Sequence, residues 1–262
     1  MAIGLMGAAL LALWRGLLWR GRDLPDVARP EPLLVGHRGV RGALPENSVA
    51  AFSAALEAGL DGLETDVQRS RDGVLVLLHD AHLSGVAVAS MTLAELRERV
   101  PELATVDELY ELVRRFPGTW LNLEIKSARP FEPRLVRALV RSVRSSALAG
   151  RITVSSFNPV ALALLRLQAP ELRTGYLWPD SALPTWLRSG WPAGWLHVDA
   201  LHPNWRQVDA RLVARARRRG LALNTWTVNE AEEVRRMVDL GVSGIMADDP
   251  EALIGAARGG TG

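Results

Sequence analysis

Carboxylates and one lysine cluster in two short segments of the sequence. Glu64 and Asp66 are separated by one residue in an apolar run, and Glu124 and Lys126 end another apolar run. Side chains alternate along a strand, so both members of each pair project from one face. Three carboxylates on one side of a sheet repel each other unless a cation lies among them, and oxygen ligands without a thiolate favour a hard ion. We therefore predict that Glu64, Asp66 and Glu124 bind one divalent cation, Mg²⁺ or Ca²⁺.

Lys126 is the only lysine among 31 basic residues. A compact ammonium on a flexible stem differs chemically from a planar guanidinium. A single lysine two residues after a glutamate is therefore interpreted as a residue with a chemical role at this position. Its charge suits a point where negative charge builds up in a transition state.

Two histidines follow apolar runs, His37 before Arg38 and His79 before Asp80. Imidazole titrates near neutral pH, so the pair can act as base and acid, and Arg38 offers a forked donor to nonbridging phosphate oxygens. The net charge is zero when one phosphodiester joins the three carboxylates, a divalent cation, Arg38 and Lys126. These residues predict a metal-assisted phosphodiester site. The other histidines are interpreted as structural, with His202 as a candidate supporting group and His82 and His197 as ordinary core or surface residues.

The sequence has no cysteine, which excludes thiol nucleophiles, thiolate metal sites and disulfides. No motif pairs a serine or threonine with a histidine either. The attacking group is therefore expected to be water or a hydroxyl of the substrate itself.

From Leu33 onward, apolar runs alternate with helical patterns, which is typical of a parallel sheet with covering helices. Asp72-Gly73 predicts a two-residue hairpin loop that places His79 opposite Asp66, to within one residue. With the return arm of this hairpin set aside, the fold class is α/β, an eight-stranded (β/α) TIM-type barrel with a β-hairpin extension after the second strand. The nine strand candidates are Leu33–His37, Gly62–Gln68, Val74–His79, Trp120–Lys126, Ile152–Phe157, Thr174–Trp178, Leu196–Leu201, Leu221–Thr227 and Gly244–Ala247.

Helix starts are predicted after each of several capping or proline residues, near Ser48, Thr92, Thr105, Pro133, Pro159, Gln207 and Asn229.

In a (β/α) barrel the C-terminal ends of the strands form the active site. The polar residues named above, together with Trp226 and Asp248, fall at such ends.

The 262 residues, 48% hydrophobic and 23% charged, suit one large domain. A net charge of +2 gives no reason to expect nucleic acid as a partner, and the basic run 215–219 is interpreted as the solvated face of a helix over 207–220. Residues 1–22 form an apolar segment, expected to associate with membrane, with a helix packed on the domain as the alternative. Residues 23–32 form a linker and 33–262 the barrel domain. The protein is expected in the cytoplasm or on a membrane.

The ordered motifs resemble the glycerophosphodiester phosphodiesterase family over roughly residues 33–253. The resemblance implies a barrel of the phospholipase C-like phosphodiesterase superfamily, a divalent metal on Glu64, Asp66 and Glu124, and hydrolysis of glycerophosphodiesters to glycerol 3-phosphate and an alcohol. It implies catalysis by His37 and His79, and substrate binding by Arg38, Lys126 and Trp226. The motifs are His37-Arg38-Gly39, Pro45-Glu46-Asn47-Ser48, Glu64-Thr65-Asp66-Val67, Asp72-Gly73, His79-Asp80, Glu124-Ile125-Lys126, Ser155-Ser156-Phe157, Trp226-Thr227-Val228-Asn229 and Asp248-Asp249-Pro250.

Two other functions remain open on the sequence. A phospholipase D-like enzyme acting on lysophospholipids would use the same metal and histidines, and the apolar N-terminus and the tryptophans over 178–205 would suit a lipid. A non-catalytic lipid or head-group binder is disfavoured, because no ligand or histidine is missing.

Overall fold

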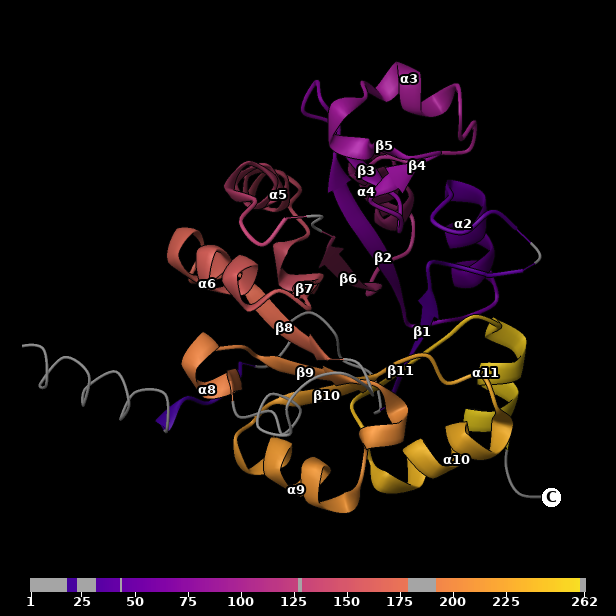
Figure 1. Cartoon of the computed structure of the whole chain (residues 1–262). Helices are drawn as coiled ribbons and strands as arrows, with labels where there is room; N and C mark the ends of the chain where they lie inside the picture. Colours follow the sequence, from indigo (N-terminus) through magenta and orange to yellow (C-terminus); the bar gives the residue numbers. More distant parts are fainter. Residues whose placement is uncertain (1–17, 23–31, 43, 127–128, 179–191, 260–262) are drawn as a thin grey trace, which may run out of the picture.

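Eight parallel strands close into a barrel within a ring of helices, as Figure 1 shows. In this computed structural model the described residues are 18–22, 32–42, 44–126, 129–178 and 192–259. The first strand pairs with both the second and the last, which closes the barrel and confirms the predicted fold class. The barrel strands are β1 (Leu33–His37), β2 (Gly62–Arg69), β6 (Trp120–Ile125), β7 (Ile152–Ser156), β8 (Arg173–Trp178), β9 (Ala200–Pro203), β10 (Ala222–Thr225) and β11 (Gly244–Ala247).

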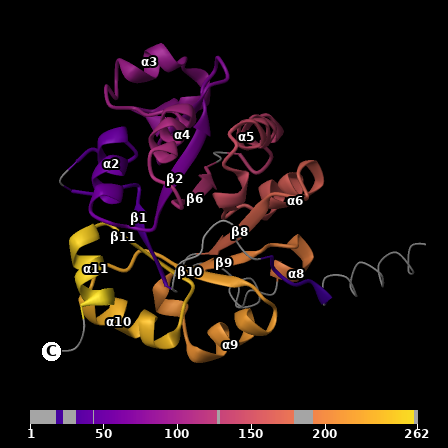
Figure 2. The same ribbon diagram turned by 180° about the vertical axis from the view of Figure 1, so that it is seen from behind.

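A helix follows each strand before the chain re-enters the barrel (Figure 2). Ser48 caps the first of them, and Thr92 and Thr105 each form a capping box, so these predicted starts are confirmed. The outer helices are α2 (Val49–Glu57), α4 (Val106–Arg114), α5 (Pro133–Ser145), α6 (Pro159–Gln168), α8 (Pro192–Leu196), α9 (Ala210–Arg218), α10 (Ala231–Leu240) and α11 (Pro250–Arg258).

Two predicted elements near β9 are wrong in their bounds. The strand predicted over Leu196–Leu201 is instead the end of α8, a turn at His197 with φ 50°, and then β9. Proline at the first position of α8 favours a helix there, which the apolar run alone did not reveal. The helix predicted from Gln207 begins at Ala210, because Trp205–Gln207 forms a 3₁₀ turn and Asp209 provides the cap.

The hairpin after β2 has a three-residue loop rather than the two-residue loop predicted. The arm β3 (Leu75–Leu77) pairs antiparallel with β2, and Ser70 N–H donates to Val74 C=O at 2.9 Å. Gly73 has φ 96°, a conformation that glycine adopts without steric cost. Leu78 rather than His79 therefore lies opposite Asp66, a shift of one residue. The segment that follows packs on a small core of its own through β4 (His82–Leu83), β5 (Val86–Ala87), the 3₁₀ helix Val88–Ser90 and α3 (Leu93–Arg97).

The two ends of the barrel differ in chemistry. We call the carboxyl ends of the strands the mouth and the amino ends the closed end. Below the mouth the interior is filled by a small apolar cluster made of Leu33, Val35, Trp120 and Met246, with Trp226 packed against it. The predicted polar residues lie at the mouth, because every barrel strand points the same way.

Residues Trp19 to Arg22 lie against the closed end. The Trp19 indole donates to Val198 C=O at 2.7 Å, and Gly21 N–H donates to Arg219 C=O at 3.0 Å. Residues 1–17 and 23–31, where most of the predicted apolar segment and linker fall, lie outside the described residues. Among the residues that are described, no helix is long and apolar enough to cross a membrane.

Candidate active site

Three buried carboxylates converge at the mouth. Glu64 and Asp66 project from β2, and Glu124 lies beside Asp66 on the neighbouring strand β6. One oxygen from each lies within 4.8 Å of the others. The prediction that these three side chains form one cluster is therefore confirmed by their geometry.

The charges of this cluster are poorly compensated by the protein. Burial, together with repulsion from Asp66 and Glu124, raises the pKa of Glu64 well above its usual range. Burial also raises the pKa of Glu124 to about 7, against the opposing effect of Lys126. Glu64 Oε2 has no hydrogen-bond partner although it is buried. A buried carboxylate oxygen without a partner is costly, so the donor set fits a hard divalent cation.

Asp66 is held by two cations and an amide. Its Oδ1 lies 3.3 Å from Lys126 Nζ and its Oδ2 lies 3.0 Å from Arg38 Nε. Burial acts to raise the pKa of Asp66, but Lys126, Arg38 and a hydrogen bond from Asn47 outweigh it and hold that pKa below its usual value. Asp66 is therefore the carboxylate that stays ionised before a cation arrives.

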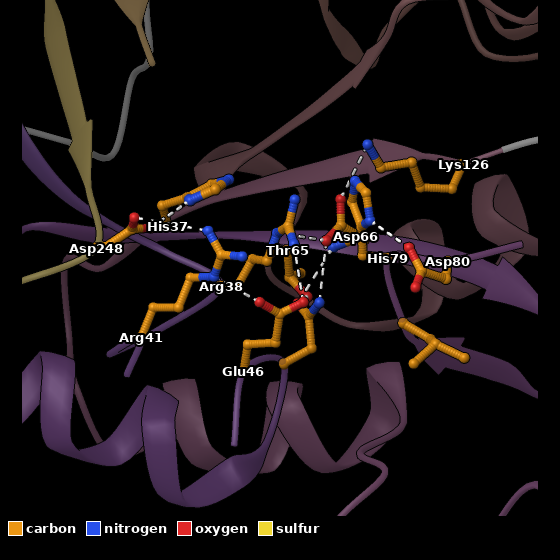
Figure 3. Close-up of polar contacts among 12 residues, drawn as sticks. His37, Arg38, Arg41, Glu46, Thr65, Asp66, His79, Asp80, Lys126 and Asp248 are labelled. Atoms are coloured by element: carbon orange, nitrogen blue, oxygen red, sulfur yellow. Dashed lines mark hydrogen bonds and ion pairs between the residues drawn. The ribbon is translucent and has the colours of Figure 1, made fainter. Parts of the chain in front are cut away.

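Asn47 locks the loop after β1 onto β2. Its backbone has φ 57°, its Nδ2 donates to Asp66 Oδ2 at 3.0 Å, and its Oδ1 accepts from Thr65 Oγ1 at 2.7 Å. In the same loop Glu46 accepts from Arg38 at 2.8 Å and from Arg41 at 2.7 Å (Figure 3). The loop thus fixes the Arg38 guanidinium over the carboxylates.

Lys126 directly follows β6, and its ammonium lies 2.7 Å from Glu124 Oε1. The ammonium also lies 5.4 Å from the centre of the Phe157 ring, and that ring meets Trp226 edge to face at 5.4 Å. Trp226 Nε1 donates to His202 C=O at 2.9 Å, which fixes the indole at the rim. A cationic and an aromatic surface therefore meet on one side of the mouth.

His37 is oriented by a carboxylate from the opposite end of the sequence. Its Nδ1 lies 2.6 Å from Asp248 Oδ1, and its Nε2 lies 3.9 Å from Glu64 Oε2. Asn229 donates to the second oxygen of Asp248 at 2.8 Å. Burial acts to raise the pKa of Asp248, but hydrogen bonds from His37 and Asn229 hold it below its usual value. Asp248 thus stays ionised and keeps Nδ1 of His37 occupied, which leaves Nε2 for the cavity.

His79 comes from the hairpin and is more open. Its Nδ1 lies 2.8 Å from Asp80 Oδ1, and 38% of its side chain is exposed. Both histidines line one cavity of about 200 Å³ at the mouth. Its lining residues are His37, Arg38, Glu64, His79, Glu124, Lys126, Phe157, Leu177, Trp226 and Met246.

The structure thus brings together all eight predicted site residues, with Asp66 just behind the cavity wall. Sequence reasoning named Asp248 as a polar residue at a strand end and Asn47 as a possible helix cap, but it predicted neither the contact of Asp248 with His37 nor that of Asn47 with Asp66. His202 lies fully buried inside the barrel, where burial lowers its pKa to about 3 and its Nε2 lies 3.0 Å from Asn224 Nδ2. It lies behind the Trp226 wall and does not line the cavity.

Comparisons with known proteins agree with this site. The sequence profile described as the glycerophosphoryl diester phosphodiesterase family matches residues 37–252. A glycerophosphodiester phosphodiesterase of Caldanaerobacter subterraneus is 33% identical over 87% of this chain and 98% of its own length.

Solved structures agree as well. A glycerophosphodiester phosphodiesterase from Thermotoga maritima shares 25% identity and a TM-score of 0.72, covering 86% of this chain and 98% of its own. A phosphodiesterase from Oleispira antarctica, solved with the product sn-glycerol-3-phosphate, shares 25% identity and a TM-score of 0.74, covering 87% of this chain and 97% of its own.

Proposed function

The chain belongs to the glycerophosphoryl diester phosphodiesterase family, and on that premise we propose that it hydrolyses glycerophosphodiesters to glycerol 3-phosphate and an alcohol. The observation that carries the proposal is the cavity in which Glu64, Glu124, Arg38, Lys126 and two histidines face one space. The Oleispira relative, whose structure holds the glycerol 3-phosphate product, supports the same substrate class.

Glu64, Asp66 and Glu124 would hold one divalent cation, Mg²⁺ or Ca²⁺. Bound there, such an ion would offset the charge of the phosphate and acidify a nearby hydroxyl. Arg38 would contact nonbridging oxygens as a fork, and Lys126 would add a point charge beside them. The Trp226 ring, held against Phe157, would pack on the glycerol or head group.

The reaction has two steps in this proposal. His37 removes the proton of the glycerol hydroxyl next to the phosphate, that oxygen bonds to phosphorus, and the bond from phosphorus to the alcohol oxygen breaks. His79 gives its proton to the departing alcohol, leaving a cyclic phosphate. Water then opens the ring with the histidines in exchanged roles, so both regain their starting protonation. The ionised Asp248 supports His37 as the base, because Nδ1 is already engaged.

The test uses purified protein and glycerophosphocholine, with and without chelator. We expect metal-dependent release of choline and glycerol 3-phosphate. An analogue with hydrogen in place of the adjacent hydroxyl should react far more slowly, and equal rates would replace internal attack with attack by water. Faster turnover of a lysophospholipid than of glycerophosphocholine would favour the phospholipase D-like alternative.

We also propose that residues 1–22 associate with membrane. The support is compositional: residues 2–14 are apolar, and arginines at 15, 20 and 22 follow them.

A further inference from the structure

We propose that the closed end of the barrel is the face that meets an anionic lipid surface, so that the catalytic mouth points away from the membrane. The proposal rests on the membrane association of the N-terminal segment given above and adds the face and its orientation. It is carried by two independent observations on the described residues, a close-fitting dock and a cluster of arginines.

The dock is made by Trp19, Gly21 and Arg22. Arg22 bonds both oxygens of the fully buried Asp199, with Nε at 2.9 Å from Oδ1 and Nη2 at 2.8 Å from Oδ2. Its guanidinium also donates to the carbonyls of Pro170, Glu171 and Leu172 at 2.8 to 3.0 Å.

Trp19 and Gly21 fit as closely. Trp19 stacks on His197 at 4.5 Å and lies under the Arg166 guanidinium at 5.3 Å. A side chain on Gly21 would come within 2.5 Å of Gly220 O, so only glycine fits there. These contacts hold Trp19 to Arg22 at this end of the barrel.

Every hydrogen-bond partner of this dock directly precedes a strand. Residues 170–172 lead into β8, 197–199 into β9 and 219–220 into β10, so the dock lies at the amino ends of three adjacent strands. The site lies at the carboxyl ends. With about 3.3 Å per residue and the usual tilt, a six-residue strand such as β8 separates the two ends by roughly 15 Å. In Figure 1 residues 18–22 lie beside α8.

Exposed arginines adjoin the dock in the sequence. Arg20, Arg217 and Arg218 are exposed, and the backbone of Arg219 bonds Gly21. Nearby acids offset little of this charge, since Asp199 is buried under Arg22 and Glu171 is paired with Arg144 at 2.7 Å. Among the described residues of the adjoining helix end, Asp239 of α10 is the exposed acid. An apolar segment beside a basic patch is the two-part signal that gives stable binding to anionic bilayers.

The first experiment measures sedimentation of the full chain with vesicles of phosphatidylcholine, with and without phosphatidylglycerol. We expect binding that increases with phosphatidylglycerol. Replacing Arg217 and Arg218 with alanine should weaken it about tenfold, from a loss of about 1 kcal/mol per arginine partly screened by salt. The matched control replaces Arg134 and Arg137, exposed on α5, and should change binding far less. Equal losses in both double variants would overturn the proposal.

The second experiment measures orientation and uses the absence of cysteine from the sequence. Val160 is 42% exposed at the mouth end of α6 and Leu167 is 81% exposed at its closed end, so Val160→Cys and Leu167→Cys place a fluorophore at either end of one helix. Quenching by spin-labelled lipid should be strong at 167 and weak at 160. Equal or reversed quenching, or no vesicle binding, overturns the proposal. Hydrolysis of glycerophosphocholine without vesicles tests the proposed catalysis separately.

Discussion

His37 Nδ1 lies 2.6 Å from Asp248 Oδ1, although 211 residues separate them in the sequence. The contact crosses the seam between β1 and β11, the strands that close the barrel. The proposed general base is therefore oriented by the residue that directly follows β11, the last strand in the sequence.

Replacing Asp248 with asparagine should lower kcat by roughly 10²-fold while KM changes little, because an amide N–H facing Nδ1 favours the tautomer with its proton on Nε2. Asp249→Asn is the matched control, since asparagine also caps α11. Steady-state kinetics on glycerophosphocholine measure both. A variant that raises KM with kcat intact would assign Asp248 to substrate binding instead.

Replacing Lys126 with arginine should cost about tenfold or more in kcat despite the retained charge. The ammonium lies 2.7 Å from a Glu124 oxygen and 3.3 Å from an Asp66 oxygen. A planar guanidinium cannot reach both oxygens from that position without displacing one of the two carboxylates. Near-normal turnover of the variant would mean that charge alone suffices at this position.

Without metal, Glu64→Gln should stabilise the fold at neutral pH. Burial, together with repulsion from Asp66 and Glu124, raises the pKa of Glu64 on folding, so the carboxyl costs free energy either as a buried charge or by binding a proton, and glutamine has neither cost. Each kcal/mol gained raises Tm by about 2–4 °C for a chain of this size. The same variant should lose the additional stabilisation that Mg²⁺ or Ca²⁺ gives the unsubstituted protein.

Thermal denaturation with chelator and with each ion measures both effects. Glu57→Gln on the surface of α2 serves as the control, because glutamine keeps the bond from Ser53. An unchanged response of Glu64→Gln to added ion would contradict the metal assignment.

Trp226→Ala should raise KM more than it lowers kcat, because in the proposed mechanism the ring packs on the substrate and takes no part in proton transfer. Trp226→Phe keeps an aromatic face against Phe157 and should recover much of the affinity. A loss confined to kcat would contradict this role.

The dock at the closed end gives a pH prediction. Burial acts to raise the pKa of Asp199, but hydrogen bonds from Arg22 and the backbone of Thr174 hold it below its usual value. The folded pKa lies below the unfolded one, so the pair stabilises the fold at pH values above about 4, and this contribution is lost as the pH falls through the lowered pKa.

Asp199→Asn should therefore cost about 2 kcal/mol of unfolding free energy at pH 7, and the difference from the unsubstituted protein should shrink in acid. Urea denaturation at several pH values measures it. Glu171→Gln, which removes an exposed pair, is expected to have little effect at any pH. A pH-independent difference for Asp199→Asn would show that shape rather than charge matters there.

The sequence predicted the strands and site residues whose signals are local. Apolar runs ending in polar residues located β1, β2, β6 and β11, and alternation placed Glu64 and Asp66 on one face. The His37–Asp248 contact could not be predicted, because its distance depends on closure of the barrel between the two ends of the chain.

The errors in the predicted bounds near β9 and in the hairpin also arise from contacts that a local sequence pattern does not encode. The stretch 196–201 carries an apolar pattern that suits either a strand or the end of a short helix, and packing of Trp19 on His197 is visible only in three dimensions. The hairpin register differed by one residue, because Asp72-Gly73 forms part of a three-residue loop as readily as a two-residue one.

The seam between β1 and β11 also orders events during synthesis. A chain that has left the ribosome only as far as β10 already carries all three carboxylates, Lys126 and both histidines, yet it has neither Asp248 to orient His37 nor the strand that completes the wall beside it. In the proposed mechanism such a chain lacks the carboxylate that orients its base, so catalytic competence waits for β11 to close the barrel.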